Sequence, residues 1–522
     1  MTTLPPRDAA LARDALAVLQ PGFTGTRAPA WLLRRLREGL CAVGLFARNI
    51  ESPAQLADLT GELRAVRPDV LVAVDEEGGD VTRLEARTGS SFPGNHALGA
   101  VDDVALTREV AHALGQRLAS CGVDLDWAPS ADVNSDPRNP VIGVRSFGDD
   151  PHLVARHTAA YVRGLQDAGV AACVKHFPGH GDTSVDSHHA LPRVDVDAAT
   201  LRARELVPFR AAVEAGVSCV MSAHIRLTAL DPERPATLSP AVLTGLLRAP
   251  ADRGGLGFRG LVVTDGMEMA AVADTWGIER GSVLALAAGA DAVCVGGGLA
   301  DGTTVVRLRD ALVRAVHDGE LPRERLADAA GRVRALAERT ARGRRRAAPG
   351  DGTAGTAPAA EAAEEVGLRA ARRALQVTGD TDGLPFASPP FVAAFTPVAT
   401  PAVGSETPWG LVAELRRLLP GTTTAAYDRG LLESEGSRAV VEEILRAASG
   451  RRIVAVVRDL HRHPWMAGAQ AALRAARPDT VVVEMGVPAA LPDGALHLAT
   501  HGAARVCARA AAEVLAGAAA AR

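Results

Sequence analysis

Residues Lys175 to His189 read KHFPGHGDTSVDSHH, and this stretch gives the strongest indication of the fold and of the functional site. The apolar run Val170 to Val174 precedes it, which predicts a buried strand that ends in Lys175. One proline and two glycines then interrupt regular structure within six residues. A strand that leads into a loop of lysine, histidine and aspartate side chains is typical of an active site carried on a rigid scaffold.

Lys175 is the only lysine among the 57 Lys and Arg residues of the chain. Positions that need only a positive charge are therefore occupied by arginine. A compact ammonium and a planar guanidinium are not interchangeable in a tight polar site. A lysine that survived by chance is the alternative, but its place at the end of an apolar strand favours a functional role.

Composition indicates an ordinary globular protein that is large enough for two or three domains. The 522 residues are 47% hydrophobic and 23% charged, with a net charge of -4, which gives no electrostatic footprint for nucleic acid or an anionic membrane. The six cysteines show no CxxC spacing, and Cys173, Cys219 and Cys294 lie in apolar runs, so we expect buried, reduced thiols. No signal peptide or membrane-spanning stretch is apparent. We therefore expect a cytoplasmic location, and the sequence predicts no oligomeric state.

Short apolar runs alternate with helix-like segments over residues 1–340. Continuous apolar strands between amphipathic stretches predict a parallel sheet covered on both faces, and eight such units favour a (β/α)8 TIM barrel. The predicted strands are Ala17–Gln20, Ala42–Phe46, Val70–Val74, Val123–Ala128, Ala171–Lys175, Ser218–Ser222, Leu261–Thr264 and Asp291–Val295.

Residues 341–375 read as a linker followed by a connecting helix, and residues 376–522 as a smaller α/β three-layer sandwich domain. The stretch Ala347 to Pro358 is rich in Gly, Ala, Pro and Thr, and the basic run Arg342 to Arg346 beside it is interpreted as a solvated flank. Strand-like runs recur at Phe391–Phe395, Thr423–Tyr427, Ile453–Val457, Thr480–Val483 and Leu496–Thr500.

Polar residues collect where the predicted barrel strands end, which is where such barrels place their chemistry. The third strand ends in Asp75, the fifth in Lys175 and His176, and the seventh in Asp265. A carboxylate held just beyond a buried strand suits a nucleophile. Asp265 could equally cap the helix that follows, and its position alone does not decide between the two roles.

The loop pair Asp186 and His188 could form a proton-transfer dyad, because an aspartate fixes the tautomer of an imidazole and strengthens its basicity. A metal site is the competing interpretation, since His176 and His180 have HxxxH spacing. That spacing brings two histidines together only on a helix, and the proline and glycines here argue against one. We therefore favour the dyad and expect neither metal nor cofactor.

Four segments carry a resemblance to glycoside hydrolase family 3, and within it to the β-N-acetylglucosaminidase branch. They are KHFPGHGDTSVDSHH, VDEEGG, TDGMEM and DLDWAPSADVNSDPRNPVIGVRSFGDD, and the resemblance extends over essentially the whole predicted barrel. The resemblance implies a retaining exo-β-N-acetylglucosaminidase that acts on a small carbohydrate substrate, either cell-wall muropeptides or chitooligosaccharides. It implies Asp265 as the nucleophile and His188, paired with Asp186, as the general acid and base. Residues that resemble the family's substrate contacts are Asp75, Arg83, Arg145, Lys175 and His176.

The chain departs from the family pattern at two places. Asp80 stands where a basic residue is expected, and Gly266, Met267 and Glu268 stand where Asp-Leu-Ser is common. A phosphorylase, with phosphate in place of water, is the nearest competing activity, because a histidine donor permits it and the Gly296–Gly298 run follows the eighth strand. A turn is the preferred interpretation of that run. The sequence also admits a β-glucosidase or β-xylosidase, a metallohydrolase and a non-catalytic sugar-binding protein.

Overall fold

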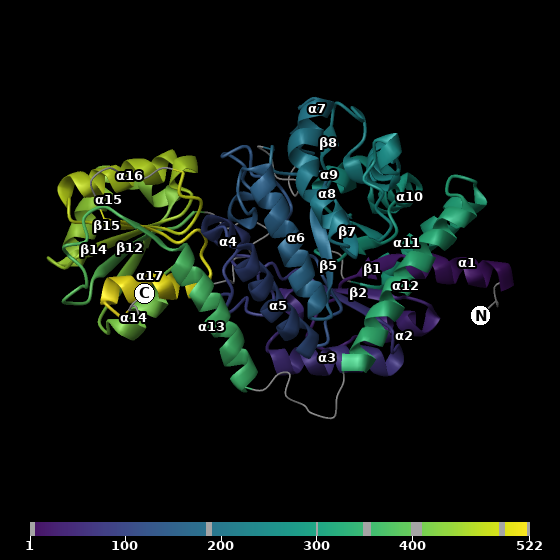
Figure 1. The fold of residues 1–522 in the computed structure, drawn as a ribbon, viewed down its shortest axis with the longest axis horizontal. Helices are drawn as coiled ribbons and strands as arrows, with labels where there is room; N and C mark the ends of the chain where they lie inside the picture. Colours follow the sequence, from purple (N-terminus) through teal and green to yellow (C-terminus); the bar gives the residue numbers. More distant parts are fainter. Residues whose placement is uncertain are drawn as a thin grey trace. The chain divides into compact units, whose positions relative to one another are not determined.

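The computed structural model divides the chain into two compact units, and each has its own sheet (Figure 1). It describes residues 6–183, 191–298, 301–347, 357–397, 410–489 and 496–518. The first unit comprises Met1–Glu77, Thr107–Ile142 and Asp149–Ala360, and the second comprises Gly78–Leu106, Gly143–Gly148 and Glu361–Arg522. Two segments that lie within the barrel sequence therefore belong to the second unit.

The first unit is the predicted (β/α)8 barrel. Six strands form one parallel sheet in the order β2-β3-β4-β5-β7-β9, and β10 pairs in parallel with β1. The amide of Thr264 on β9 donates to Ala292 O (3.0 Å) beside β10, so the sheet curls round to bring its last strand back to its first. The strands are β1 (Leu19–Pro21), β2 (Ala42–Leu45), β3 (Leu71–Val74), β4 (Leu125–Asp126), β5 (Ala171–Phe177), β7 (Cys219–Ser222), β9 (Leu261–Thr264) and β10 (Val293–Val295).

Every residue of these eight strands is buried, as continuous apolar strands under helices should be. All eight predicted strands are present, and the seventh has its predicted bounds. The covering helices are α1 (Pro6–Ala17), α2 (Ala30–Glu38), α3 (Pro53–Val66), α5 (Val104–Ser120), α6 (Pro151–Asp167), α8 (Leu206–Glu214), α10 (Ile278–Ala288), α11 (Gly302–His317) and α12 (Arg323–Ala347). Shorter pieces are α7 (Ala198–Thr200), α9 (Ala270–Trp276), η1 (Ala47–Asn49), η3 (Leu201–Glu205), η4 (Ala236–Leu238), η5 (Ala241–Arg248), η6 (Ala251–Arg253), β6 (Arg193–Val194) and β8 (Arg226–Leu227).

No backbone ladder joins β1 to β2 among the described residues. Side chains that follow β2 bridge this seam instead. Arg48 Nε and Asn49 Nδ2 both donate to Phe23 O, at 3.0 and 2.9 Å, just beyond β1. The guanidinium of Arg48 also binds the carbonyl of Gly296, just beyond β10.

Two differences from the predicted elements have a clear physical reason. Strand β5 continues to Phe177, because the Phe177 ring packs against Phe209 with 5.2 Å between centroids, so Lys175 and His176 lie within the strand. The basic run Arg342 to Arg346 is not a linker flank but the last turns of α12, where positive charge favours the helix terminus. Arg344 there forms an ion pair with the buried Asp124.

The second unit contains the predicted three-layer sandwich. Its sheet has the order β11-β16-β15-β14-β12-β13, all parallel except β11, an antiparallel edge strand that the sequence analysis missed. The strands are β11 (Gln376–Thr378), β12 (Phe391–Phe395), β13 (Thr423–Tyr427), β14 (Ile453–Val457), β15 (Val481–Glu484) and β16 (His497–Ala499). Its helical elements are α4 (Asn95–Val101), η2 (Gly143–Arg145), α13 (Ala357–Ala374), α14 (Val412–Leu418), α15 (Arg429–Ala448), η7 (Leu460–Arg462), α16 (Pro464–Ala476) and α17 (Arg505–Ala516).

Alternate residues of the strands pack into two separate apolar layers. Val454, Val456 and Val483 lie with side chains of α14 and α17, whereas Ala455 and Val457 lie with those of α15 and α16. Figure 1 shows these helix pairs on opposite faces of the sheet. The period-2 alternation of a strand therefore fills both layers of the sandwich.

Asp80, which stands where a basic residue is expected, is buried in the second unit. It forms an ion pair with Arg458 after β14, and its Oδ1 accepts from the amide of Ala503 at 2.7 Å. The carboxylate therefore connects the Gly78–Leu106 segment to the sandwich sheet within this unit.

Candidate active site

The only lysine lies in the barrel mouth between two carboxylates that follow β3. Lys175 is 2% exposed, and its Nζ forms ion pairs with Asp75 and with Glu77 Oε1, the latter at 2.7 Å. Asp75 remains partly exposed, with 19% of its side chain accessible. A buried ammonium with two carboxylate partners is fixed in position, as a group that orients a polar ligand must be.

A second buried network surrounds Asp132, which follows β4. Its Oδ2 lies 2.7 Å from His176 Nδ1, and its Oδ1 accepts from the amides of His176 and His180 at 3.1 and 2.7 Å. Burial alone would raise the pKa of Asp132, but the His176 ring and these hydrogen bonds hold it below its usual range. Asp132 therefore binds both histidines of the HxxxH pair, His176 through its ring and His180 through its amide. The His180 ring itself bonds, through Nδ1, to Thr183 Oγ1 at 2.8 Å.

Asp265 follows β9 and is not a helix cap. The N-cap of α9 is Met269, four residues further on. The Asp265 amide donates to Ser222 O (3.1 Å) on β7, and its Oδ1 accepts from the amide of Gly266 at 2.8 Å. Its partly exposed side chain is therefore held at the carboxyl end of the barrel strands, as a nucleophile requires.

The buried thiol of Cys294 shows that the carboxylates converge. Burial raises its pKa, and the charges of Glu268, Asp265 and Asp75 raise it further, so all three carboxylates lie around one thiol on β10. Burial also lowers the pKa of His180 to about 4, and the Asp265 charge acts on that ring in the opposite direction. These charge effects indicate that Asp75, Asp265 and His180 lie near one another at this end of the barrel.

Glu268 lies between β9 and α9. Its Oε1 accepts from the amides of Gly296, at 3.0 Å, and Gly297. The carboxylate therefore occupies the backbone donors of the glycine run that we considered as a phosphate site.

Several predicted site residues are not brought together in one unit. Arg83 and Arg145 belong to the second unit, where Arg145 is buried and its carbonyl accepts from Asn95 Nδ2 at 2.7 Å. Asp186 and His188 lie outside the described residues.

Sequence reasoning missed two residues that shape this mouth. Asn139 is buried, and its Nδ2 donates to the carbonyls of His180 and Gly181 at 2.8 and 3.1 Å. Glu205, on η3, is also buried, and burial raises the pKa of its carboxyl to about 7. The two contacts of Asn139 span 41 and 42 residues, and no local spacing in the sequence signals them.

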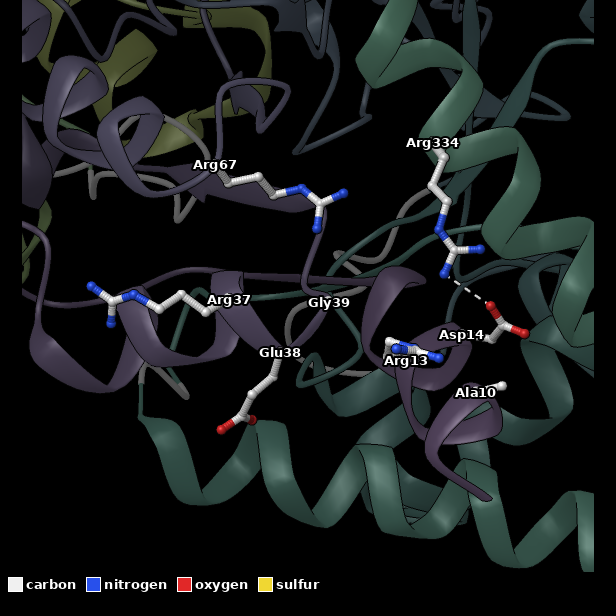
Figure 2. Close-up of a pocket in the computed structure, with 8 residues that line it drawn as sticks. All are labelled: Ala10, Arg13, Asp14, Arg37, Glu38, Gly39, Arg67 and Arg334. Atoms are coloured by element: carbon white, nitrogen blue, oxygen red, sulfur yellow. Dashed lines mark hydrogen bonds and ion pairs between the residues drawn. The ribbon is translucent and has the colours of Figure 1, made fainter. Parts of the chain in front are cut away.

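A pocket of about 450 Å³ lies at the other end of the barrel, among α1, α2, α12 and the turn after α3. Figure 2 shows Arg334 extended toward Asp14, which it contacts at 2.8 Å, and Arg67 also lines the pocket. Helices α2 and α3 lead into the amino ends of β2 and β3, so this pocket is remote from Asp75 and Asp265. Its paired surface charges do not form part of the candidate site.

All six cysteines are buried and free, as expected. Within the described ranges no three His, Cys, Asp or Glu side chains are grouped so that they could hold a metal ion. None of the described helices combines the length and apolarity needed to cross a membrane.

Comparison with known proteins assigns the barrel to a family. Residues 31–336 match the model of the glycosyl hydrolase family 3 N terminal domain. The chain therefore belongs to glycoside hydrolase family 3, as its motifs indicated.

Three relatives show the range of the likeness. The chain is 35% identical over 317 residues to Beta-hexosaminidase A of Pseudoalteromonas piscicida, which is 56% of this chain and 52% of that protein. It is 39% identical over 287 residues to a Beta-hexosaminidase of Alkalilimnicola ehrlichii, covering 53% and 80%. A solved family 3 beta-N-acetylglucosaminidase from Paenibacillus sp. str. FPU-7 is 34% identical, with a TM-score of 0.83 over 99% of this chain and 97% of that one. The matched region spans about half the length of the first relative.

Proposed function

We propose that the protein is a retaining exo-β-N-acetylhexosaminidase that removes terminal N-acetylglucosamine from cell-wall muropeptides or chitooligosaccharides. The observation that carries the proposal is the barrel mouth, where Asp265 lies at the end of β9 and a buried Lys175 is held in place by two carboxylates. The names and identities of the three relatives support the same activity.

In the proposed reaction the Asp265 carboxylate attacks the anomeric carbon while the His188 imidazolium gives its proton to the glycosidic oxygen. The bond to the leaving sugar breaks, and a covalent glycosyl-enzyme forms. Neutral His188 then takes a proton from water, whose oxygen displaces Asp265 at the same carbon. Two inversions give net retention, and Asp186 would hold His188 in the tautomer that this exchange requires. The roles of Asp186 and His188 are carried by the resemblance of their loop.

Asp75 is the proposed acceptor for hydroxyl groups of the terminal sugar. The ion pair with the buried Lys175 restrains the Asp75 carboxylate, which stays partly exposed. Arg83, Arg145 and His176 are proposed as further contacts to hydroxyl and N-acetyl groups. A neutral sugar gains its specificity from such directional hydrogen bonds.

The test is Asp265→Ala, assayed on an aryl N-acetyl-β-glucosaminide with and without azide. We expect a loss of kcat/KM on the order of 10⁴-fold. Azide should then restore turnover and yield the α-glycosyl azide, because it replaces the missing carboxylate on the same face of the sugar. Full activity of the variant without azide would overturn the assignment.

Product analysis separates the remaining possibilities. N-Acetylglucosaminyl anhydromuramic acid and chitobiose should be compared with phosphate varied, since sugar 1-phosphate would reveal a phosphorylase. A panel of aryl glucosides and xylosides tests the other family activities. Turnover that survives strong chelation removes the metallohydrolase, and binding without turnover would indicate a non-catalytic protein.

A further inference from the structure

The segment Phe177–Thr183 is the described base of the loop that carries Asp186 and His188. Its main chain is held by the buried side chains Asp132, which accepts from the His180 amide, and Asn139, which donates to the His180 carbonyl. Both come from the connection after β4, so the near side of the loop base is fixed by neutral and charged hydrogen bonds.

A further support comes from η3, on a different part of the barrel. Arg204 Nη2 binds Asp182 Oδ2 at 2.6 Å, and Arg204 Nε binds Glu205 Oε1 at 2.6 Å. Glu205 is 1% exposed and lies directly against Gly179, where a Cβ would fall 2.7 Å from Glu205 Oε2. The loop backbone therefore rests on a buried carboxyl group.

One oxygen of that carboxyl group has no donor in the part of the chain that the structure describes. Glu205 Oε2 is buried there without a hydrogen-bond partner among the described residues. The charged groups that act on the carboxyl are Arg204, which favours ionisation, and Asp132 and Asp182, which oppose it. Burial outweighs the guanidinium and brings the pKa to about 7, so the group changes protonation state near neutrality.

We propose that Glu205 is a positioning residue for the catalytic loop. As a neutral acid it packs against Gly179 and holds the loop base in place, and as an anion it no longer does so. An ionised Oε2 needs hydrogen-bond donors, and the described residues supply none. Water that reaches this oxygen from the side of Gly179 must displace the loop backbone packed against it. This inference rests on the proposed function, because it assumes that the loop delivers His188. It makes the loop base, and hence the acid/base step, sensitive to a group that never touches substrate.

The test compares wild type with Glu205→Gln across pH, measuring kcat and KM on the aryl N-acetylglucosaminide. For a pKa of about 7, the neutral fraction falls from about 0.9 at pH 6 to about 0.03 at pH 8.5, so the wild-type to variant kcat ratio should fall by up to ~30-fold. KM should change little. Glu214→Gln, an exposed change at the end of α8, is the matched control and should follow wild type at every pH.

Hydrogen exchange of a peptide that covers residues 177–183 gives a readout that does not need turnover. Protection in wild type relative to Glu205→Gln should fall between pH 6 and 8.5. Arg204→Gln should reduce protection at both pH values, because it removes the ion pair with Asp182 and the hydrogen bond to Glu205 Oε1. Ratios of kcat and of protection that stay constant with pH would overturn the role of Glu205. Absence of any glycosidase activity would refute the proposed function. The exchange measurement would still decide whether Glu205 positions the loop base.

Discussion

Replacing Lys175 by Met should destabilise the barrel strongly, because it removes a buried cation that binds two carboxylates in the mouth. The ammonium is 2% exposed and Glu77 is 3% exposed, so neither charge is hydrated by bulk water. Methionine keeps the length and volume of the side chain, and the change therefore isolates the charge.

The expected size follows from the geometry. A pair 2.7 Å apart is worth about 6 kcal/mol at an effective dielectric constant of about 20. Much of that attraction offsets the desolvation of both ions, and removing one partner of a buried pair typically costs about 3–5 kcal/mol. We expect a loss in this range at pH 7. The loss should shrink at acidic pH, where a protonated carboxyl no longer needs a cation.

Urea unfolding followed by tryptophan fluorescence measures the effect, since Trp127 is buried in the barrel. The matched control is Arg108→Met, which breaks an ion pair with Asp167 whose partners are 56% and 47% exposed. That variant should lose less than about 1 kcal/mol. If Lys175→Met loses no more than the control, the buried ion pairs do not organise the mouth.

Three further changes test other parts of the structure. Gly179→Ala should lower kcat more than it raises KM, because its Cβ would press on Glu205 Oε2 and the φ of +128° disfavours a side chain. An unchanged kcat in steady-state assays would refute the close packing of Gly179 on Glu205. Asp132→Asn should lower the free energy of unfolding in urea by about 2–4 kcal/mol at both pH 7 and pH 4. A carboxyl whose pKa is depressed loses its stabilising contribution only when the pH falls through the lowered value. If wild type and variant were equally stable at pH 4, the depressed pKa would be contradicted. A double-mutant cycle with Asp80→Asn and Arg458→Met should give a coupling of about 1–3 kcal/mol for the second unit, and strict additivity would show that the pair contributes nothing.

The barrel was predictable from sequence because its strands are continuous apolar runs between turns. The run Leu261–Thr264, for example, has the same bounds in the structure as in the prediction. Strand β11 was missed because Gln376–Thr378 is a three-residue edge strand without a continuous apolar run. The end of β5 was misplaced because Phe177 finds its partner Phe209 more than thirty residues away, which no local pattern records.

The residues of the candidate site also include some that the sequence signals and one that it does not. Asp75, Lys175 and Asp265 could be selected as candidates because each stands where an apolar run stops. Glu205 was not found, because in sequence it reads as one more charge beside an arginine on a helical surface. Its function depends on a contact with the main chain of Gly179, which leaves no side-chain signature.

The described residues of β1 and β2 share no backbone ladder, and this has a consequence for how the barrel opens. Elsewhere neighbouring strands share backbone hydrogen bonds, which most substitutions leave in place, but here the printed hydrogen bonds come from a guanidinium and an amide that single base changes can delete. Thermal breathing should therefore begin along this line, with the amino-terminal strand separating before any other. A cylinder built in this way has a preferred place to split.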